Sequence, residues 1–331
     1  MNRLVVTDCV DPWQNLAVEE HLFDTQAQTG ASLYLWQNQN TVVIGRNQNA
    51  WKECRTKMLE DEGGKLARRS SGGGAVFHDL GNLNFTFVLP KAAYDLPRQF
   101  SVLQRAVAAF GLETELSGRN DVVLTRNGAK FSGNAFRFAG QTALHHGTIL
   151  ISADMEKLGR YLAPSQQKME AKGIKSVRSR VCNLTELNPS ITIAAMVEAL
   201  SDAFEREYGS ATRQTVADLD FSCIQPLYER YASWEWRYGK TPAFDVELSN
   251  RFSWGEIQMM FTCKQGRVES CTVYTDAMDP TLSEQIARQI KNAPFTPEAL
   301  GSRMADLSDG EIGAAEDIAK SLATWIMEQR F

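Results

Sequence analysis

The amino-acid sequence predicts an α+β fold in two domains, a larger one over residues 1–225 and a smaller one over residues 226–331. The chain has 331 residues, which is long for a single hydrophobic core and fits about two domains. Strand patterns dominate the first half with helical patterns between them, a mixture typical of α+β domains. A weakly periodic stretch over residues 210–227 then precedes a second set of strands and helices.

The first elements are marked by their boundary residues. Residues 4–6 form a short apolar strand, and Asp11 followed by Pro12 is typical of a helix N-terminus. Apolar residues then recur on one face of a helix. Strands are expected at 33–36 and 41–44, with a turn at 38–40 between them.

The middle of the chain continues this alternation. A helix is expected over residues 50–61, ended by Gly63 and Gly64. Asn127-Gly128 is a strong hairpin signal between two strands. Further strands are expected at 65–69, 75–77, 84–89, 121–124, 130–138 and 143–151, and helices at 100–110, 155–162 and 193–208.

The second domain is expected to begin near Trp234. Its strands are predicted at 244–248, 257–263 and 268–274, with a hairpin turn at 264–266. Helices at 282–292 and 310–329 complete a unit of about 100 residues, an ordinary domain size.

Composition excludes several classes of protein. The net charge of −5 argues against a general nucleic-acid binder. The six cysteines are scattered without a CxxC pair, and with four histidines they form no zinc pattern. Scattered thiols fit a reducing compartment, so we expect a cytoplasmic protein. The sequence has neither a secretory signal nor an apolar run near the roughly 20 residues of a membrane helix, so no membrane association is expected.

The most informative segment is the stretch over residues 68–82, RRSSGGGAVFHDLGN. Glycines let the backbone approach a ligand closely, and successive N–H groups in such a loop bind anions. Arginine adds a planar charged fork suited to phosphate or carboxylate. The segment has neither the Gly-Lys-Ser/Thr end of a Walker loop nor the spacing of GxGxxG. It predicts a loop that holds an anionic ligand against the main chain.

Lys130 and Asp121 flank the hairpin and are candidates for the chemistry. Lys130 precedes Ser132-Gly133-Asn134-Ala135, small residues that permit close approach of a ligand, and an ammonium there would stabilise developing negative charge. An exposed strand lysine that aids solubility is the alternative. Asp121 is equally consistent with an Mg²⁺ ligand and with an Asx turn before a strand.

Two further motifs contain basic or imidazole groups. His145 and His146 are adjacent on a strand and point to opposite faces, which argues against a shared metal. The run over residues 172–181, KGIKSVRSRV, is either a solvated loop or a segment that docks an acidic partner or closes over an anion.

Several of these motifs, taken in order, resemble lipoate–protein ligase A in its bacterial two-domain form. They are DPWQNLAVEE (11–20), RSSGGGAVFHD (69–79), GRND (118–121), KFSGNA (130–135), HHGT (145–148) and KGIKSVRSR (172–180). The segments SWEW (233–236) and FSWG (252–255) resemble its accessory domain. The resemblance implies a large mixed-sheet catalytic domain of the biotin/lipoate ligase type and a smaller α+β C-terminal accessory domain.

The resemblance also implies an activity. The family joins lipoate to a lysine of lipoyl domains, those of the E2 subunits of 2-oxoacid dehydrogenase complexes and the glycine-cleavage carrier protein. ATP and Mg²⁺ activate lipoate as lipoyl-adenylate with loss of pyrophosphate, and the lysine then displaces AMP to form an amide. Octanoate is expected as a second substrate, and we expect a monomer.

The roles implied for single residues follow the motifs. Lys130 is the expected catalytic residue and contacts both the lipoyl carbonyl and the adenylate phosphate, while Asp121 is the expected Mg²⁺ ligand. The ATP and adenylate site is expected to include Arg69, Gly74, Ala75, Val76, Phe77, Asn82 and Lys130. The lipoate site is expected to include Trp36, Ser71, Gly72, Gly73, His78, Lys130, His146 and Gly147. Lys172, Arg178 and Arg180 are expected in an adenylate-responsive loop.

Two residues depart from the family, and two other functions compete. Phe131 and Asn134 stand where smaller residues are common, and either narrows or reshapes the pocket. A lipoyl or octanoyl transferase that takes a preformed acyl donor shares the glycine loop and the lysine. A non-catalytic lipoate sensor is the alternative from another class. Biotin–protein ligase shares the chemistry but carries a different glycine- and arginine-rich loop.

Overall fold

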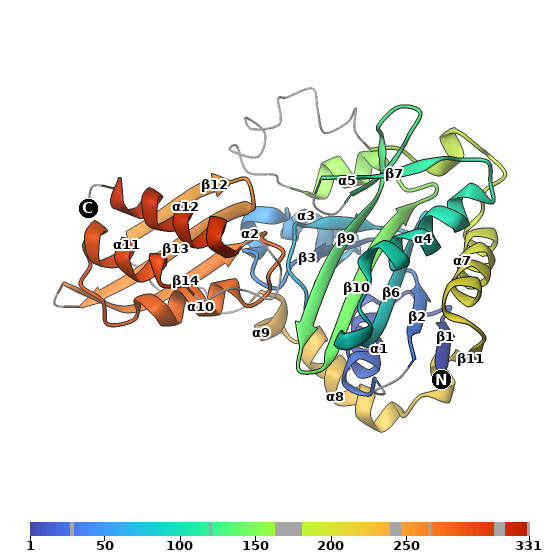
Figure 1. Ribbon diagram of the computed structural model, residues 1–331, viewed down its shortest axis with the longest axis horizontal. Coiled ribbons are helices and arrows are strands. Elements are labelled where there is room, and N and C mark those ends of the chain that lie inside the picture. Colours follow the sequence, from blue (N-terminus) through green and yellow to red (C-terminus); the bar gives the residue numbers. More distant parts are fainter. Residues whose placement is uncertain are drawn as a thin grey trace.

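The computed structural model describes residues 1–26, 30–118, 121–162, 181–238, 246–264, 266–307 and 315–329. It confirms the α+β class: a mixed sheet of eight strands forms the centre of the larger part (Figure 1). From one edge to the other its strands are β11 (Ala211–Thr215), β1 (Asn2–Val6), β2 (Ser32–Trp36), β6 (Asn82–Pro90), β10 (Thr142–Leu150), β9 (Lys130–Ala139), β8 (Asp121–Leu124) and β7 (Thr114–Ser117).

Helices cover both faces of this sheet because its strands alternate two buried sets of apolar side chains. Leu33 and Leu35 face a core shared with α4 (Leu96–Ala108) and α7 (Ile193–Tyr208). Tyr34 and Trp36 face the opposite core. The helices on that side are α1 (Pro12–Asp24) and α8 (Phe221–Ala232), which pack on each other.

The predicted helix start at Asp11 is confirmed. The Asp11 carboxylate accepts hydrogen bonds from the backbone N–H groups of Trp13, at 2.9 Å, and Gln14, at 3.2 Å, and Pro12 begins α1. These bonds satisfy N–H groups that have no partner within the helix. The cap therefore fixes where α1 starts and which of its faces meets the sheet.

A second, three-stranded sheet lies beside the first and carries the glycine loop. In it β3 (Thr41–Ile44) pairs parallel with β4 (Lys65–Arg68) and antiparallel with β5 (Val76–His78). The helix expected over residues 50–61 is wrong as one element, since the structure has α2 (Ala50–Glu53) and α3 (Thr56–Asp61). The N–H of Arg55 donates to the carbonyl of Tyr161 at 2.9 Å, at the end of α5 (Met155–Tyr161), and this contact separates the two helices.

The strands that sequence patterns missed are the two edges of the large sheet. The segment of β11, ATRQT, and that of β7, TELS, lack the apolar alternation of a buried strand. Each is held by backbone pairing to one neighbour, β11 parallel to β1 and β7 antiparallel to β8. An edge strand needs no buried side-chain row, which explains the weak signal. Short 3₁₀ turns occur at Lys91–Ala93, Leu184–Glu186 and Val216–Asp218.

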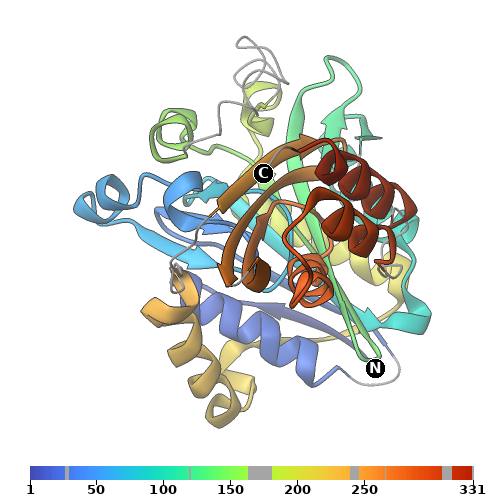
Figure 2. The same cartoon turned by 90° about the vertical axis from the view of Figure 1, so that its left-hand side faces the viewer.

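The C-terminal unit has its own sheet and core (Figure 2). Its strands are β12 (Val246–Phe252), β13 (Gly255–Lys264) and β14 (Arg267–Thr275), joined antiparallel in that order. Its helices are α10 (Leu282–Ile290), α11 (Pro297–Ala305) and α12 (Ala315–Met327). Helix α11 was not predicted, although Thr296 caps it and Pro297 begins it.

The expected domain boundary between residues 225 and 226 falls inside α8. The next helix, α9 (Trp234–Arg237), is bonded to the first unit: the Trp236 indole N–H donates to the carbonyl of Arg68 at 2.8 Å. Arg68 in turn donates to the carbonyls of Trp236 and Arg237 at 2.9 Å. This packing favours a boundary between Tyr238 and Val246, and the division into domains stays a prediction.

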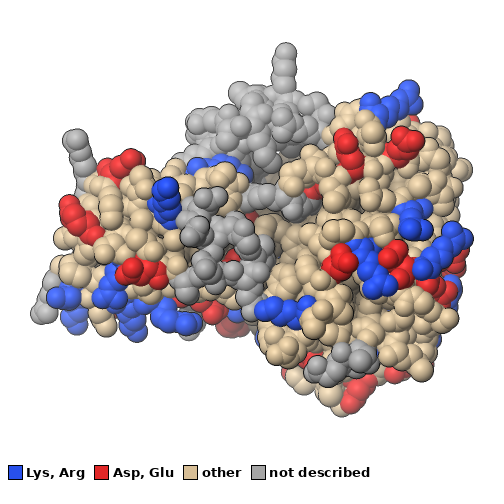
Figure 3. Space-filling view, viewed as in Figure 1, with Lys and Arg blue, Asp and Glu red and all other residues tan. Residues whose placement is uncertain are grey.

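On the face shown in Figure 3, positive and negative side chains are interspersed. In the part of the chain that the structure describes, no helix combines the length and apolar character that crossing a membrane requires.

Candidate active site

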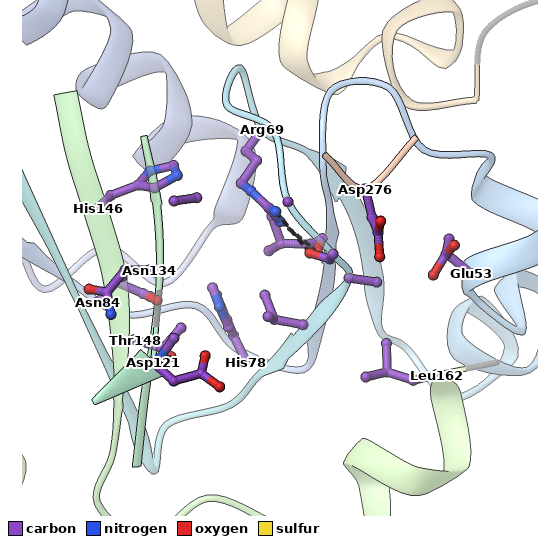
Figure 4. Close-up of a pocket in the computed structure, with 18 of the residues that line it drawn as sticks. Glu53, Arg69, His78, Asn84, Asp121, Asn134, His146, Thr148, Leu162 and Asp276 are labelled. Carbon is purple, nitrogen blue, oxygen red and sulfur yellow. Dashed lines mark hydrogen bonds between the residues drawn. The ribbon is translucent and has the colours of Figure 1, made fainter. Parts of the chain in front are cut away.

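A cavity of about 620 Å³ lies between the two sheets of the larger unit and reaches the C-terminal unit (Figure 4). Its apolar walls include Leu16, Trp36, Val43 and Val76. Its polar lining includes Arg69, His78, Lys130, Asp121 and His146. The cavity therefore joins an apolar interior to a charged region in one space.

The structure brings together most of the residues expected at the site. Those that line the cavity are Trp36, Arg69, Gly73, Gly74, Ala75, Val76, His78, Asp121, Lys130, His146 and Gly147. Four others are not among the described lining residues: Ser71, Gly72, Phe77 and Asn82. Phe77 packs on Tyr161 in a separate core, and Asn82 donates to Asn84, which does line the cavity. Lys172, Arg178 and Arg180 lie outside the described residues.

Arg69 is buried behind the glycine loop and binds the loop itself. Its guanidinium donates to the carbonyls of Gly72, at 2.6 Å, and Gly74, at 2.8 Å, and to the hydroxyl of Ser71 at 3.0 Å. Burial lowers the pKa of Arg69 to about 10, which leaves it charged at neutral pH. Its geometry makes it the support of the loop, and its expected contact with ATP stays a prediction.

The glycine loop needs glycine at position 73. Gly73 has φ +88°, and a Cβ there would lie 2.9 Å from Nη2 of Arg69. The N–H of Gly73 donates to the carbonyl of Ala277, in the C-terminal unit, at 3.0 Å. The glycine loop is thus held by the side chain of Arg69, which donates to its carbonyls, and by a backbone hydrogen bond from Gly73 to the C-terminal unit.

Lys130 and Asp121 form an ion pair at the opposite wall, with 2.7 Å between Nζ and Oδ1. The pairing of β8 with β9 shifts register between Val122 and Val123, and such bulges re-aim side chains. Gly133 leaves room for the lysine, because a Cβ there would lie 2.9 Å from its Nζ. Gly133 therefore makes room for the Lys130 side chain, and the close approach of a ligand to these small residues stays a prediction.

Asp121 is a carboxylate in the cavity, as a magnesium site beside phosphates requires, where one or two carboxylates usually suffice. Within the described ranges no group of three His, Cys, Asp or Glu side chains is placed to hold a metal. A single carboxylate fits an ion whose other ligands are mainly phosphate oxygens of a bound nucleotide. The Mg²⁺ role of Asp121 stays a prediction.

The two adjacent histidines face opposite sides of the sheet. His145 stacks on Phe87 and lies 2.8 Å from Gln99 and 2.9 Å from Asn134. His146 contacts Ser71 and Glu19, each at 2.6 Å. The two rings therefore contact different groups on opposite faces of the sheet, as the alternation along a strand predicted.

His78 is a neutral histidine in the cavity wall. Asn38 donates from Nδ2 to its Nδ1 at 3.1 Å, so the ring proton lies on Nε2. Burial lowers the pKa of His78 to about 3, and burial also holds the pKa of His145 well below its usual range. The Nε2 atom of His78 has no partner among the described residues. A neutral donor therefore remains for a ligand.

These two histidines predict that the protein loses stability in mild acid. A histidine in the unfolded chain binds a proton below about pH 6.5, whereas folded His78 resists protonation down to about pH 3. The free energy of unfolding should thus fall as pH drops through this window, by about 1.4 kcal/mol per pH unit per histidine. Urea unfolding at pH values between about 6.5 and 5 measures the slope. In the variant His78→Gln the free energy of unfolding should fall less steeply with falling pH. An unchanged slope contradicts the low pKa of His78.

Sequence patterns missed the cavity residues that come from other elements. Asn84, on β6, is one of them. Of the two residues expected to reshape the pocket, Asn134, on β9, does line the cavity (Figure 4), whereas Phe131 is buried in the core and does not. Arg251, Asp276 and Met278 come from the C-terminal unit, and Asp276 lines the same cavity as Glu53 of α2 (Figure 4). The spacing of Asn82 and Asn84 along one strand was an available signal, but nothing local indicated Asp276.

Comparison with known families matches both units. The model described as lipoyl protein ligase A/B catalytic domain matches residues 11–205. The model described as bacterial lipoate protein ligase C-terminus matches residues 241–326.

Three solved structures are similar to the chain. LipL1 of P. falciparum in complex with lipoate is 26% identical, with 99% of this chain and 100% of that chain covered and a TM-score of 0.87. A bi-partite lipoate protein ligase from Thermoplasma acidophilum, studied with its E2 lipoyl domain, is 28% identical, with 74% and 99% covered and a TM-score of 0.64. A lipoate-protein ligase A bound with ATP is 25% identical, with 72% and 98% covered and a TM-score of 0.62.

Proposed function

The chain belongs to the lipoyl protein ligase A/B catalytic domain family, and from this membership we propose that it is an ATP-dependent lipoate–protein ligase. In the proposed reaction lipoate and ATP form lipoyl-adenylate with release of pyrophosphate. The acceptor lysine of a lipoyl domain then attacks the lipoyl carbonyl, an amide forms, and AMP leaves.

One observation carries the proposal: Lys130 and the glycine loop line one cavity whose interior is apolar. Leu16, Trp36 and Val43 supply the apolar wall, which suits a hydrocarbon tail. Lys130 lines the same cavity and would supply positive charge where the tail's carboxylate meets a phosphate. The relatives whose structures hold lipoate or ATP support the same pairing of ligands.

The residues of this chain would act by charge and position. A carboxylate is a poor acyl donor, and ATP supplies the leaving group that makes it reactive. Lys130 would neutralise the two anions during adenylation and the oxyanion during transfer. The glycine loop would bind phosphate oxygens through its N–H groups, and Asp121 would hold Mg²⁺ beside them.

The partners follow from the proposed chemistry. The acceptors would be lipoyl domains of E2 subunits and the glycine-cleavage carrier protein, and the archaeal relative studied with its E2 lipoyl domain supports the first. Octanoate would enter the same apolar interior. The enzyme would act as a monomer, and its six cysteines, which form no disulfide in the structure, fit the cytoplasm.

The test is mass spectrometry of an apo lipoyl domain incubated with this protein, lipoate and Mg²⁺, with and without ATP. We expect a lipoyl mass gain only with ATP, together with pyrophosphate. A gain only when lipoyl-adenylate is supplied would indicate a transferase that uses a preformed donor. No gain under either condition, with tight lipoate binding, would indicate a sensor.

A further inference from the structure

Arg69 is a buried cation that has no direct counter-ion among the residues that the structure describes. Its side chain donates to three backbone carbonyls, those of Val43, Gly72 and Gly74, and to the hydroxyl of Ser71. Among the ion pairs of the described residues, none includes Arg69. A buried charge is costly unless other groups stabilise it, so the structure must supply negative charge by another route.

That route is a chain of hydrogen bonds to Glu19, on α1. Arg69 Nε lies 3.0 Å from Ser71 Oγ, which lies 2.6 Å from His146 Nε2. His146 Nδ1 lies 2.6 Å from Oε1 of Glu19, whose residue is 1% exposed. Ser71 is fully buried, so bulk water does not interrupt the chain.

The direction of these bonds is set from the Glu19 end. A carboxylate can only accept, so His146 donates to Glu19 from Nδ1, and in a singly protonated ring Nε2 then carries no proton. Nε2 therefore accepts from the hydroxyl of Ser71, which itself accepts from the Arg69 guanidinium; the Gly72 carbonyl, at 3.4 Å, is the more distant acceptor of the same hydroxyl. Chains of aligned hydrogen bonds strengthen one another in a buried setting.

A second chain reaches the same carboxylate oxygen from the pocket wall. The indole N–H of Trp36 donates to the hydroxyl of Thr86 at 3.1 Å, and that hydroxyl donates to Oε1 of Glu19 at 2.7 Å. Thr86 and His146 are register partners on β6 and β10, which places both donors beside Glu19. One carboxylate oxygen thus accepts from two donors on neighbouring strands, one linked to the glycine loop and the other to Trp36.

We propose that Glu19, which is not among the described lining residues, is a positioning residue of this site. Its carboxylate fixes Arg69 and the glycine loop through His146 and Ser71, and fixes Trp36 through Thr86. Loss of its charge removes the negative charge that stabilises Arg69 through the hydrogen-bond chain. The glycine loop and Trp36 are then both held less firmly. This inference deepens the proposed ligase function and rests on it for its kinetic part only.

The histidine tautomer tests the chain without any assay of activity. The protein has four histidines, so ¹⁵N-histidine NMR resolves each ring, and His146→Gln assigns the signals of His146. In the unaltered protein we expect the His146 proton on Nδ1. In Glu19→Leu, Nδ1 loses its acceptor and the proton should move to Nε2. An Nε2 proton, or a doubly protonated ring, in the unaltered protein at neutral pH overturns the proposal.

Kinetics test the consequence with the isosteric variant Glu19→Gln, which keeps the side-chain volume. We expect kcat/KM for lipoate-dependent pyrophosphate release to fall about 10- to 100-fold, the range found when a partner that orients a metal-bound histidine is removed. Glu207→Gln is the matched control, because Glu207 accepts from Arg98 at 3.1 Å and Ser101 at 3.2 Å on the far side of the sheet. An effect of Glu19→Gln no larger than that of the control overturns the proposal. If the unaltered protein releases no pyrophosphate, the ligase function fails, and the tautomer still decides the chain.

Discussion

Lys130→Ala is expected to lower the rate of lipoate-dependent pyrophosphate release about 10²- to 10³-fold, the usual cost of removing one group that stabilises developing charge. Lys130 faces the cavity on a strand whose backbone is held in place: its carbonyl accepts from the N–H of Cys182 at 3.0 Å. The variant loses the positive charge that would face the ligand anions, and it removes the ion-pair partner of Asp121. The effect is measured as the rate of pyrophosphate release, with a coupled assay that converts pyrophosphate to phosphate for detection.

The matched control is Lys291→Ala, which removes an exposed lysine after α10 in the C-terminal unit. It should leave the rate unchanged. Lys130→Arg separates charge from shape, since the planar guanidinium keeps the charge but must fit beside Gly133. If Lys130→Ala retained the full rate, the charge stabilisation would have to come from another group, and the role given to Lys130 would be wrong.

Gly73→Ala is expected to disrupt the glycine loop and to abolish most activity. An L-residue with φ +88° is strained, and the new Cβ would lie 2.9 Å from a guanidinium that several hydrogen bonds hold in place. We expect the free energy of unfolding to fall by about 1 to 3 kcal/mol. Urea unfolding followed by circular dichroism measures the first effect, and pyrophosphate release the second.

Gly74→Ala, the adjacent change, is the control for stability. A Cβ at Gly74 would meet no described atom within 4 Å, and its φ is not in the left-handed range. Its free energy of unfolding should match that of the unaltered protein. Equal destabilisation by both variants would show that the loop is sensitive to any added Cβ and would contradict the argument from conformation.

The sequence was informative where one local rule settles the structure. Asp11 and Pro12 predicted the start of α1, and Asn127-Gly128 predicted the hairpin between β8 and β9, because caps and tight turns depend on neighbouring residues. It was uninformative for β11 and β7, whose pairing partners lie elsewhere in the chain. The sequence pattern placed the expected domain boundary inside α8. No local pattern distinguishes a helix that packs on α1 from a helix that begins a new domain.

The sequence by itself determined the class of fold, the glycine loop and the candidate lysine, since each depends on residue type, spacing and order along the chain. Only the tertiary structure decided that Arg69 faces the loop's own carbonyls, that Lys130 pairs with Asp121, and that residues of the C-terminal unit line the cavity. Glu19 is the clearest case. Its helix, α1, is evident from local pattern, but its link to Arg69 passes through residues 71 and 146, and only the folded chain brings those side chains within hydrogen-bond distance.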